Sequence, residues 1–139
     1  MIDKATREKI ISLIRREVVP ALGCTEPIAV SLAVAKATEL LGMQPEEINL
    51  GLSGNIIKNA MGVGIPGTGM IGLPIAIALG SLIGKSEYGL EVLKEVSPEA
   101  VDRGKAFIES VPINIKHLPD SPSNLHVDVE VRAQGHSAR

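Results

Sequence analysis

The residues best suited to chemistry stand around Cys24, the only cysteine among 139 residues. It occurs in the run ALGCTEP, just before a stretch that favours a helix capped by Thr25, with Glu26 and Pro27 in the first turn. The positive end of that helix dipole favours a thiolate, which both a nucleophile and a metal ligand require. Glu26 opposes the thiolate unless a cation lies between the two groups. The alternative is a small buried side chain, the usual state of a single cysteine.

A second group of polar residues lies in SGNIIKNAM, just before a glycine-rich segment. If this stretch is helical, Asn55, Lys58 and Asn59 share one face, because residues three and four apart are neighbours on a helix. Two amides and an ammonium beside a glycine loop suit a small anionic substrate, such as an amino-acid carboxylate. In the alternative interpretation Lys58 is a solvated surface charge and the asparagines cap turns.

The glycine-rich segment contains two apparent nucleotide-binding patterns, and both fail on context. GVGIPG at 62–67 matches the dinucleotide pattern, but it does not follow a strand directly, and Pro66 stands where the phosphate-facing helix should begin. GSLIGKS at 80–86 has three residues between its glycines where a P-loop needs four. The segment therefore predicts neither a Rossmann site nor a P-loop.

Three histidines are candidates for proton transfer or metal binding. His126 alternates with valines and is expected on the polar face of a strand, and His117 is expected near a turn. Neither forms a metal-type spacing with Cys24. His136, in the terminal GHSAR, ends a strand and could transfer protons beside a site, or it could belong to a tail.

The order of the elements predicts an α+β fold with apolar core helices, a small antiparallel β-sheet and a glycine-rich loop. Apolar periodicity predicts helices at 3–18, stopped by Pro20, and at 25–41, a strand at 48–53, and a buried helix in LPIAIALGSLIG. Capping residues predict helices at 86–96 and 97–110. The strands PINIKH and LHVDVEVRA are expected to flank a turn, LPDSPSN.

The composition excludes several classes of protein. A net charge of −2 and only two aromatic residues argue against nucleic-acid binding. A single cysteine cannot form an internal disulfide, and the charged start MIDKATREK lacks an apolar signal core, so a cytoplasmic protein of one domain, residues 1–139, is expected. The uncharged stretch 59–84 is long enough for a membrane span, but its glycines and prolines favour a buried loop and core helix, so no membrane is expected as a partner.

Two long runs carry a family resemblance. PALGCTEPIAVSLAVAKA and SGNIIKNAMGVGIPGTGMIGLPIAIALG resemble the L-cysteine desulfidase family, which is related to the α chain of iron–sulfur-dependent L-serine dehydratases. GHSAR resembles a further motif of that family. Its members are longer, so the resemblance implies that the chain is an N-terminal portion of a longer lyase, or one chain of a split enzyme. The missing C-terminal part, or a second copy in a homodimer, is then the expected partner.

The resemblance implies a cytoplasmic enzyme, a lyase that uses a [4Fe-4S] cluster to convert L-cysteine to pyruvate, ammonia and sulfide. It assigns Cys24 as the first of three cysteine ligands; the other two are absent, so this chain alone is not expected to hold the cluster. Lys58 and His136 are then the expected catalytic residues. The expected cradle for the small amino-acid substrate or the cluster consists of Asn55, Lys58, Asn59, Gly67 and Thr68.

Two other functions remain open at this point. L-serine dehydration by the same machinery differs only in the leaving group. A non-catalytic domain that binds a small molecule would need no cluster.

Overall fold

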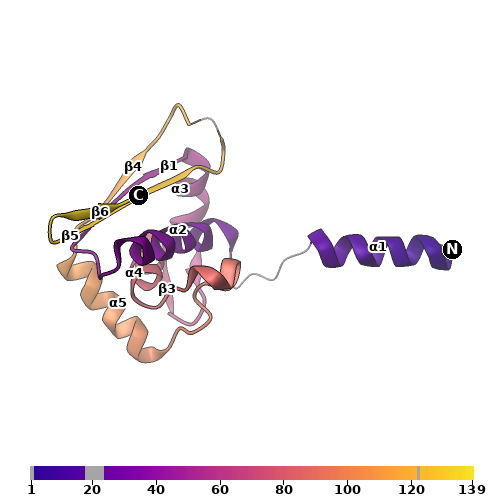
Figure 1. The fold of residues 1–139 in the computed structure, drawn as a ribbon, viewed down its shortest axis with the longest axis horizontal. Coiled ribbons are helices and arrows are strands. Elements are labelled where there is room, and N and C mark those ends of the chain that lie inside the picture. The colour runs from indigo at the N-terminus through magenta and orange to yellow at the C-terminus, as the bar shows by residue number, and fades with distance from the viewer. Residues whose placement is uncertain (1, 18–23, 122) are drawn as a thin grey trace.

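The computed structural model describes residues 2–17, 24–121 and 123–139, and it confirms the α+β class (Figure 1). The elements, in chain order, are α1 (Lys4–Glu17), α2 (Thr25–Leu41), β1 (Glu47–Leu52), α3 (Gly54–Ala60), β2 (Gly64–Ile65), β3 (Met70–Ile71), α4 (Leu73–Leu82), the 3₁₀ helix η1 (Ser86–Glu91), α5 (Pro98–Ser110), β4 (Ile113–His117), β5 (Val127–Ala133) and β6 (His136–Ala138).

The four-stranded sheet has the order β4-β1-β5-β6 and is mixed. β1 runs parallel to β4, with Ile48 opposite Ile113, and antiparallel to β5, with Leu50 opposite Val129. The two strands that flank the LPDSPSN turn are therefore not neighbours, because β1 lies between them. β1 buries every second side chain, so one of its faces packs against the core, and it lies between β4 and β5 in the sheet.

Two apolar helices fill the core beneath one face of the sheet. α2 and α4 pack against each other, and α2 also contacts β5 (Figure 1). Their close approach depends on Gly80: a Cβ there would lie 2.6 Å from the backbone oxygen of Ser31. The Ser31 hydroxyl donates a hydrogen bond of 2.8 Å to the Ala76 carbonyl, so the buried polar group between the helices is satisfied.

The glycine-rich segment forms a short hairpin rather than an open loop. β2 pairs antiparallel with β3, and Gly67 and Gly69 in the turn have φ angles of 78° and 66°. Such angles are strained for residues with a Cβ. A Cβ at Gly67 would also lie 2.6 Å from Cγ1 of Val96. Both the φ angle and the close approach of Val96 therefore favour glycine at this position.

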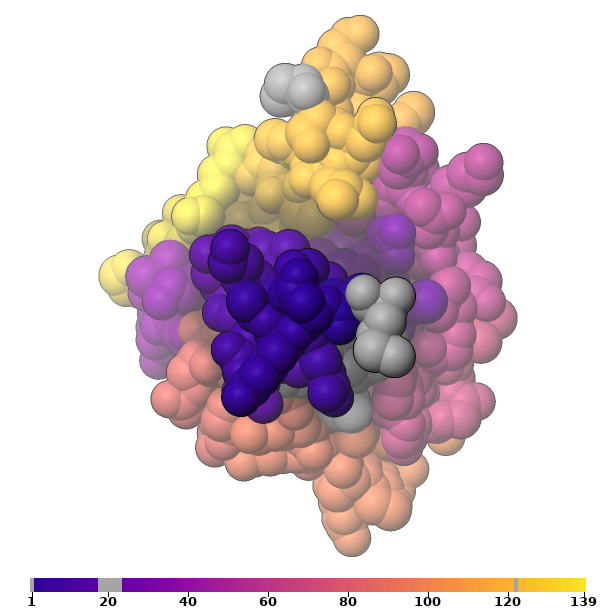
Figure 2. Space-filling model, turned by 90° about the vertical axis from the view of Figure 1, so that its right-hand side faces the viewer, coloured from indigo at the N-terminus to yellow at the C-terminus, as the bar shows by residue number. Residues whose placement is uncertain are grey.

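The helix α1 makes no buried contact in the described chain (Figure 1). Asp3 caps it as expected, since its Oδ1 accepts a 2.8 Å hydrogen bond from the Thr6 amide. Its apolar residues Ile10, Leu13 and Ile14 are 41 to 51% exposed. Figure 2 views the molecule from the side on which α1 lies, in front of the body. Val18 and Pro20, the expected end of the helix, lie outside the described residues.

The uncharged stretch 59–84 contains the ten-residue helix α4, whose side chains are mostly buried in the core. Within the described ranges, no helix combines the length and the apolar character that crossing a bilayer requires.

Candidate functional site

A hollow of about 310 Å³ opens where β1 and β4 end and α3 begins. Because these two strands are parallel, their carboxyl ends meet at the same edge of the sheet. Leu52, the last residue of β1, lies opposite His117, the last residue of β4. The lining residues come from α3 and its N-cap, from the end of β4 and from the loop after it: Ser53, Gly54, Asn55, Lys58, His117, Leu118, Pro119, Ser121, Ser123 and Asn124.

Ser53 holds the two walls of the hollow together. Its hydroxyl donates a 2.8 Å hydrogen bond to the Asn124 carbonyl and accepts one of 3.1 Å from the His126 amide. Its own amide donates to the His126 carbonyl at 3.0 Å. Ser53 is 3% exposed, so these three bonds replace water and fix the loop before β5 against the start of α3.

The charge of the hollow is positive. Lys58 is exposed and forms no ion pair with any described residue. Asn55 lies three residues before it on α3, and the hollow has no Asp or Glu in its lining. An ammonium, an amide and no carboxylate favour an anionic ligand, and a carboxylate of a small molecule fits that chemistry.

The predicted trio on α3 divides between two neighbouring surfaces. Asn55 and Lys58 line the hollow, whereas Asn59 lies toward α2. The Asn59 side-chain amide donates a 3.4 Å hydrogen bond to Oε1 of Glu26, in the first turn of α2. This contact connects the polar face of α3 with the start of α2, where Cys24 lies.

Cys24 is exposed and is itself the N-cap of α2, one position before the cap expected from the sequence. Its side chain makes no capping hydrogen bond, so the thiol is free for chemistry in the described structure. The interpretation of Cys24 as buried filler is therefore wrong. Its position at the positive end of a 17-residue helix is the one expected for a reactive thiol or a ligand.

Gly67 and Thr68 lie in the β2–β3 turn and contribute nothing to the lining of the hollow. The Thr68 hydroxyl donates to the Ile65 carbonyl at 2.6 Å and accepts from the Met70 amide at 2.9 Å. These bonds close the turn, which gives both residues a structural role.

His136 lies at the other end of the sheet. It is the first residue of β6 and pairs with Ala133 of β5. It also borders a separate hollow, together with Glu46 and Glu47 at the start of β1. β1 has six residues, so its two ends are roughly 17 Å apart at about 3.4 Å per residue. The histidine at the positive hollow is His117, which the sequence placed only near a turn. His117 reaches the hollow because β4 pairs in parallel with β1, and this pairing was not predicted from the sequence.

Among the described residues, no group of three or more His, Cys, Asp or Glu side chains is arranged to hold a metal ion. Cys24 can supply one thiolate, whereas a [4Fe-4S] cluster is held by several. The described residues of this chain therefore do not fit the cluster by themselves.

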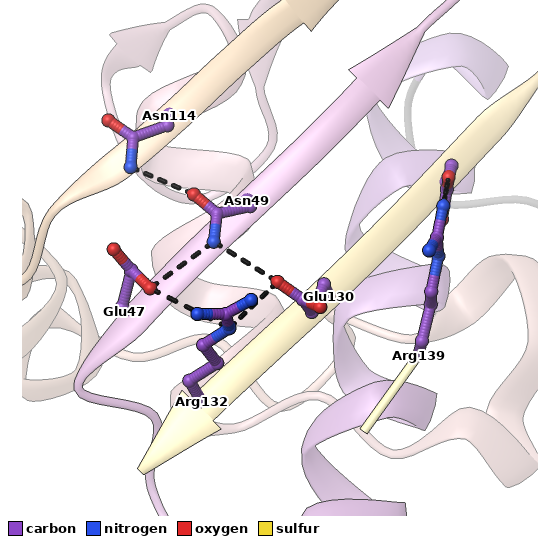
Figure 3. Close-up of polar contacts among 7 residues, drawn as sticks. Glu47, Asn49, Asn114, Glu130, Arg132 and Arg139 are labelled. Carbon is purple, nitrogen blue, oxygen red and sulfur yellow. Dashed lines mark hydrogen bonds and ion pairs between the residues drawn. The ribbon is translucent and has the colours of Figure 1, made fainter. Parts of the chain in front are cut away.

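A second polar cluster covers the outer face of the sheet (Figure 3). Asn114 donates a 2.9 Å hydrogen bond to Asn49, whose amide reaches Glu47 at 3.3 Å and Glu130 at 3.4 Å. Arg132 donates to Glu130 at 2.9 Å, and this bond lowers the pKa of Glu130. These groups satisfy one another, so the cluster is a solvated sheet face that needs no ligand.

Comparison with known proteins finds similar sequences that all carry one name. It is 63% identical over 138 residues to a UPF0597 protein of Phocaeicola vulgatus, covering 99% of this chain and 32% of that protein. A UPF0597 protein of Aeromonas hydrophila is 48% identical over 136 residues, covering 98% of this chain and 31% of that protein. No family model and no solved structure matches. Over the aligned residues the chain is similar to proteins named UPF0597, and it spans about a third of the length of these relatives.

The assignment to the L-cysteine desulfidase family is thereby corrected, because relatives at 46 to 63% identity carry the UPF0597 name instead. The prediction that the chain is an N-terminal portion of such a desulfidase is wrong for the same reason.

Packing accounts for much of the glycine pattern behind the resemblance. Gly67 meets Val96, Gly80 meets the Ser31 backbone, and Gly84 would place a Cβ 2.9 Å from Cβ of Ala35. Because packing alone requires these glycines, their presence in the sequence does not indicate which reaction the protein catalyses.

Proposed function

We propose that this chain carries the substrate-binding face of an iron–sulfur-dependent lyase that eliminates sulfide from L-cysteine. The observation that supports it is the positive hollow with Lys58 and Asn55, which has no carboxylate in its lining. Asn59, one residue after Lys58, contacts Glu26, two residues after the exposed Cys24. The substrate carboxylate binds Lys58, and Asn55 donates a hydrogen bond to it.

The reaction needs a group that removes the α-proton and a leaving group at the β-carbon. When the Cα–H bond breaks, its electron pair forms the Cα=Cβ double bond and the C–S bond pair leaves with sulfur. The aminoacrylate takes up a proton to become an imine, and water hydrolyses the imine to pyruvate and ammonia. No net oxidation or reduction occurs. Holding the carboxylate on Lys58 fixes the α-carbon, which is the positioning that such a step requires.

Cys24 is the candidate first ligand of the cluster, which would supply Lewis-acid chemistry when bound. The further thiolates must come from outside these 139 residues. The relatives are about three times as long as this chain, which leaves room for them.

L-serine is the alternative substrate, because the hollow recognises the carboxylate that both amino acids share. A colourless small-molecule-binding domain is the alternative without catalysis.

The test uses the full-length gene product, purified without oxygen, with Cys24→Ser alongside. Sulfide and pyruvate release from L-cysteine by the parent, with loss of iron and of activity in the variant, supports the proposal. Pyruvate from L-serine without sulfide from L-cysteine would assign the alternative substrate. An iron-free, colourless parent that still binds L-cysteine would overturn the lyase proposal in favour of the binding domain.

A further inference from the structure

Among the described residues, His117 is the histidine that lines the hollow beside α3. Its imidazole is exposed, and its side chain forms no hydrogen bond with the described residues. Lys58 is the only other titratable group in the lining, and the nearby Asp120 lies outside it. A free imidazole that lines the same hollow as Lys58 is a candidate general base.

Gly54 provides the space for this imidazole. A Cβ at position 54 would lie 3.1 Å from Nε2 of His117 and 3.9 Å from its Cδ2, with no other atom so near. The φ angle of Gly54 is not positive, so its backbone conformation does not require glycine. Alanine would also suit the first turn of α3 better. A methyl group at this position would therefore press on the imidazole of His117 rather than on the backbone.

The other two histidines have different surroundings. His136 lies at the opposite end of β1, beside Glu46 and Glu47. His126 contributes its backbone amide and carbonyl to the bonds with Ser53, directly before β5. Neither lines the hollow that contains Lys58.

We infer that His117 is the catalytic base of this site and that Gly54 is its positioning residue. This inference rests on the proposed amino-acid lyase and replaces His136 in the proton-transfer role. The imidazole accepts the α-proton of an amino acid whose carboxylate is bound by Lys58. The electron pair left on the α-carbon either takes a deuteron back in D₂O or expels the β-substituent.

The test measures α-proton exchange of L-alanine in D₂O by NMR with the full-length protein. L-alanine has no leaving group, so its exchange reports proton removal alone. We expect His117→Asn to slow exchange about 100-fold or more, and His136→Asn to leave it unchanged. Gly54→Ala should slow exchange roughly tenfold, because small displacements of a catalytic group are costly. Gly62→Ala is its control, since a Cβ there meets nothing within 4 Å.

Two readouts separate this inference from general damage to the protein. Free imidazole added to His117→Ala should restore part of the exchange, because the hollow is open. The His117 Cε1–H signal of the parent should also move on addition of L-alanine, whereas the His136 signal should not.

The outcomes also separate the inference from the proposed function. Exchange that depends on His117 without release of pyruvate or sulfide would support the inference and overturn the lyase. Elimination and exchange that survive His117→Asn unchanged would overturn the inference and leave the lyase standing. A parent protein without exchange overturns the inference as well.

Discussion

Asn59 donates a hydrogen bond from its side-chain amide to Oε1 of Glu26 at 3.4 Å, and so joins α3 to the first turn of α2. The contact unites two groups of residues that are 33 positions apart in the chain. One is the exposed thiol at the N-cap of α2, and the other is the polar face of α3. The contact therefore brings the polar face of α3 to the first turn of α2, which begins directly after Cys24.

The exposure of Cys24 predicts its reactivity. One equivalent of a thiol reagent should react with the folded chain without denaturant. Alkylation is measured by mass spectrometry over time. A thiol that reacts only after denaturation would contradict the exposure of Cys24.

Gly80→Ala should destabilise the chain strongly. The added Cβ would lie 2.6 Å from the Ser31 oxygen, and this atom is backbone that cannot move aside. Overpacking of this kind costs about 1 to 3 kcal/mol, or roughly 4 to 12 °C in the thermal midpoint. Gly64→Ala, where a Cβ meets nothing within 4 Å, is the matched control. Equal melting temperatures by circular dichroism would refute the close approach of α2 and α4.

Ser53→Ala should loosen the hollow while the fold survives. It removes the bond to the Asn124 carbonyl and takes from the His126 amide its hydrogen bond to the Ser53 hydroxyl, at a cost of about 1 to 3 kcal/mol. We expect faster amide exchange in residues 123–126 and weaker binding of L-alanine. Ser110→Ala removes only an exposed bond to the Ala106 carbonyl, and it should change neither quantity.

Glu39 makes stability depend on pH. Its carboxylate accepts hydrogen bonds from the hydroxyl and the amide of Ser86, which hold its pKa below the ordinary value of 4.5. A lowered pKa means that this stabilisation is present above pH 4.5 and is lost as the pH falls through the folded-state pKa. Glu39→Gln should therefore melt earlier than the parent at neutral pH, and the difference should shrink in acid. Glu109→Gln, exposed at the end of α5, should show no such trend.

Removal of residues 1–17 should leave the melting temperature of the body nearly unchanged. No residue of α1 is buried, so the deletion takes no apolar contact from the core. A large fall in the midpoint would show that α1 packs on the body in solution.

The sequence predicted the elements well where the signals were local. The Asp3 cap and Gly42, which ends α2 with a φ angle of 77°, marked helix boundaries correctly. The buried helix α4 followed from its apolar run. Strand order was not local, because the insertion of β1 between β4 and β5 depends on which apolar faces must be covered.

The same limit explains the partial prediction of the site. Asn55 and Lys58 share a helix face, and the spacing alone brought them together. His117 joins them only through a parallel strand pair that spans 65 positions of the chain. His136 was predicted to be catalytic because of its GHSAR motif, although the pairing of β6 places it at the end of the sheet away from Lys58.

The central claim is that Lys58 holds a substrate carboxylate, and steady-state kinetics of Lys58→Met test it most directly. The full-length protein should show a KM for L-cysteine raised roughly 10- to 100-fold in Lys58→Met, because a charge-assisted hydrogen bond is lost. Lys105→Met, an exposed lysine on α5, should match the parent. Unchanged kinetics in Lys58→Met would remove the hollow from the reaction and contradict the account.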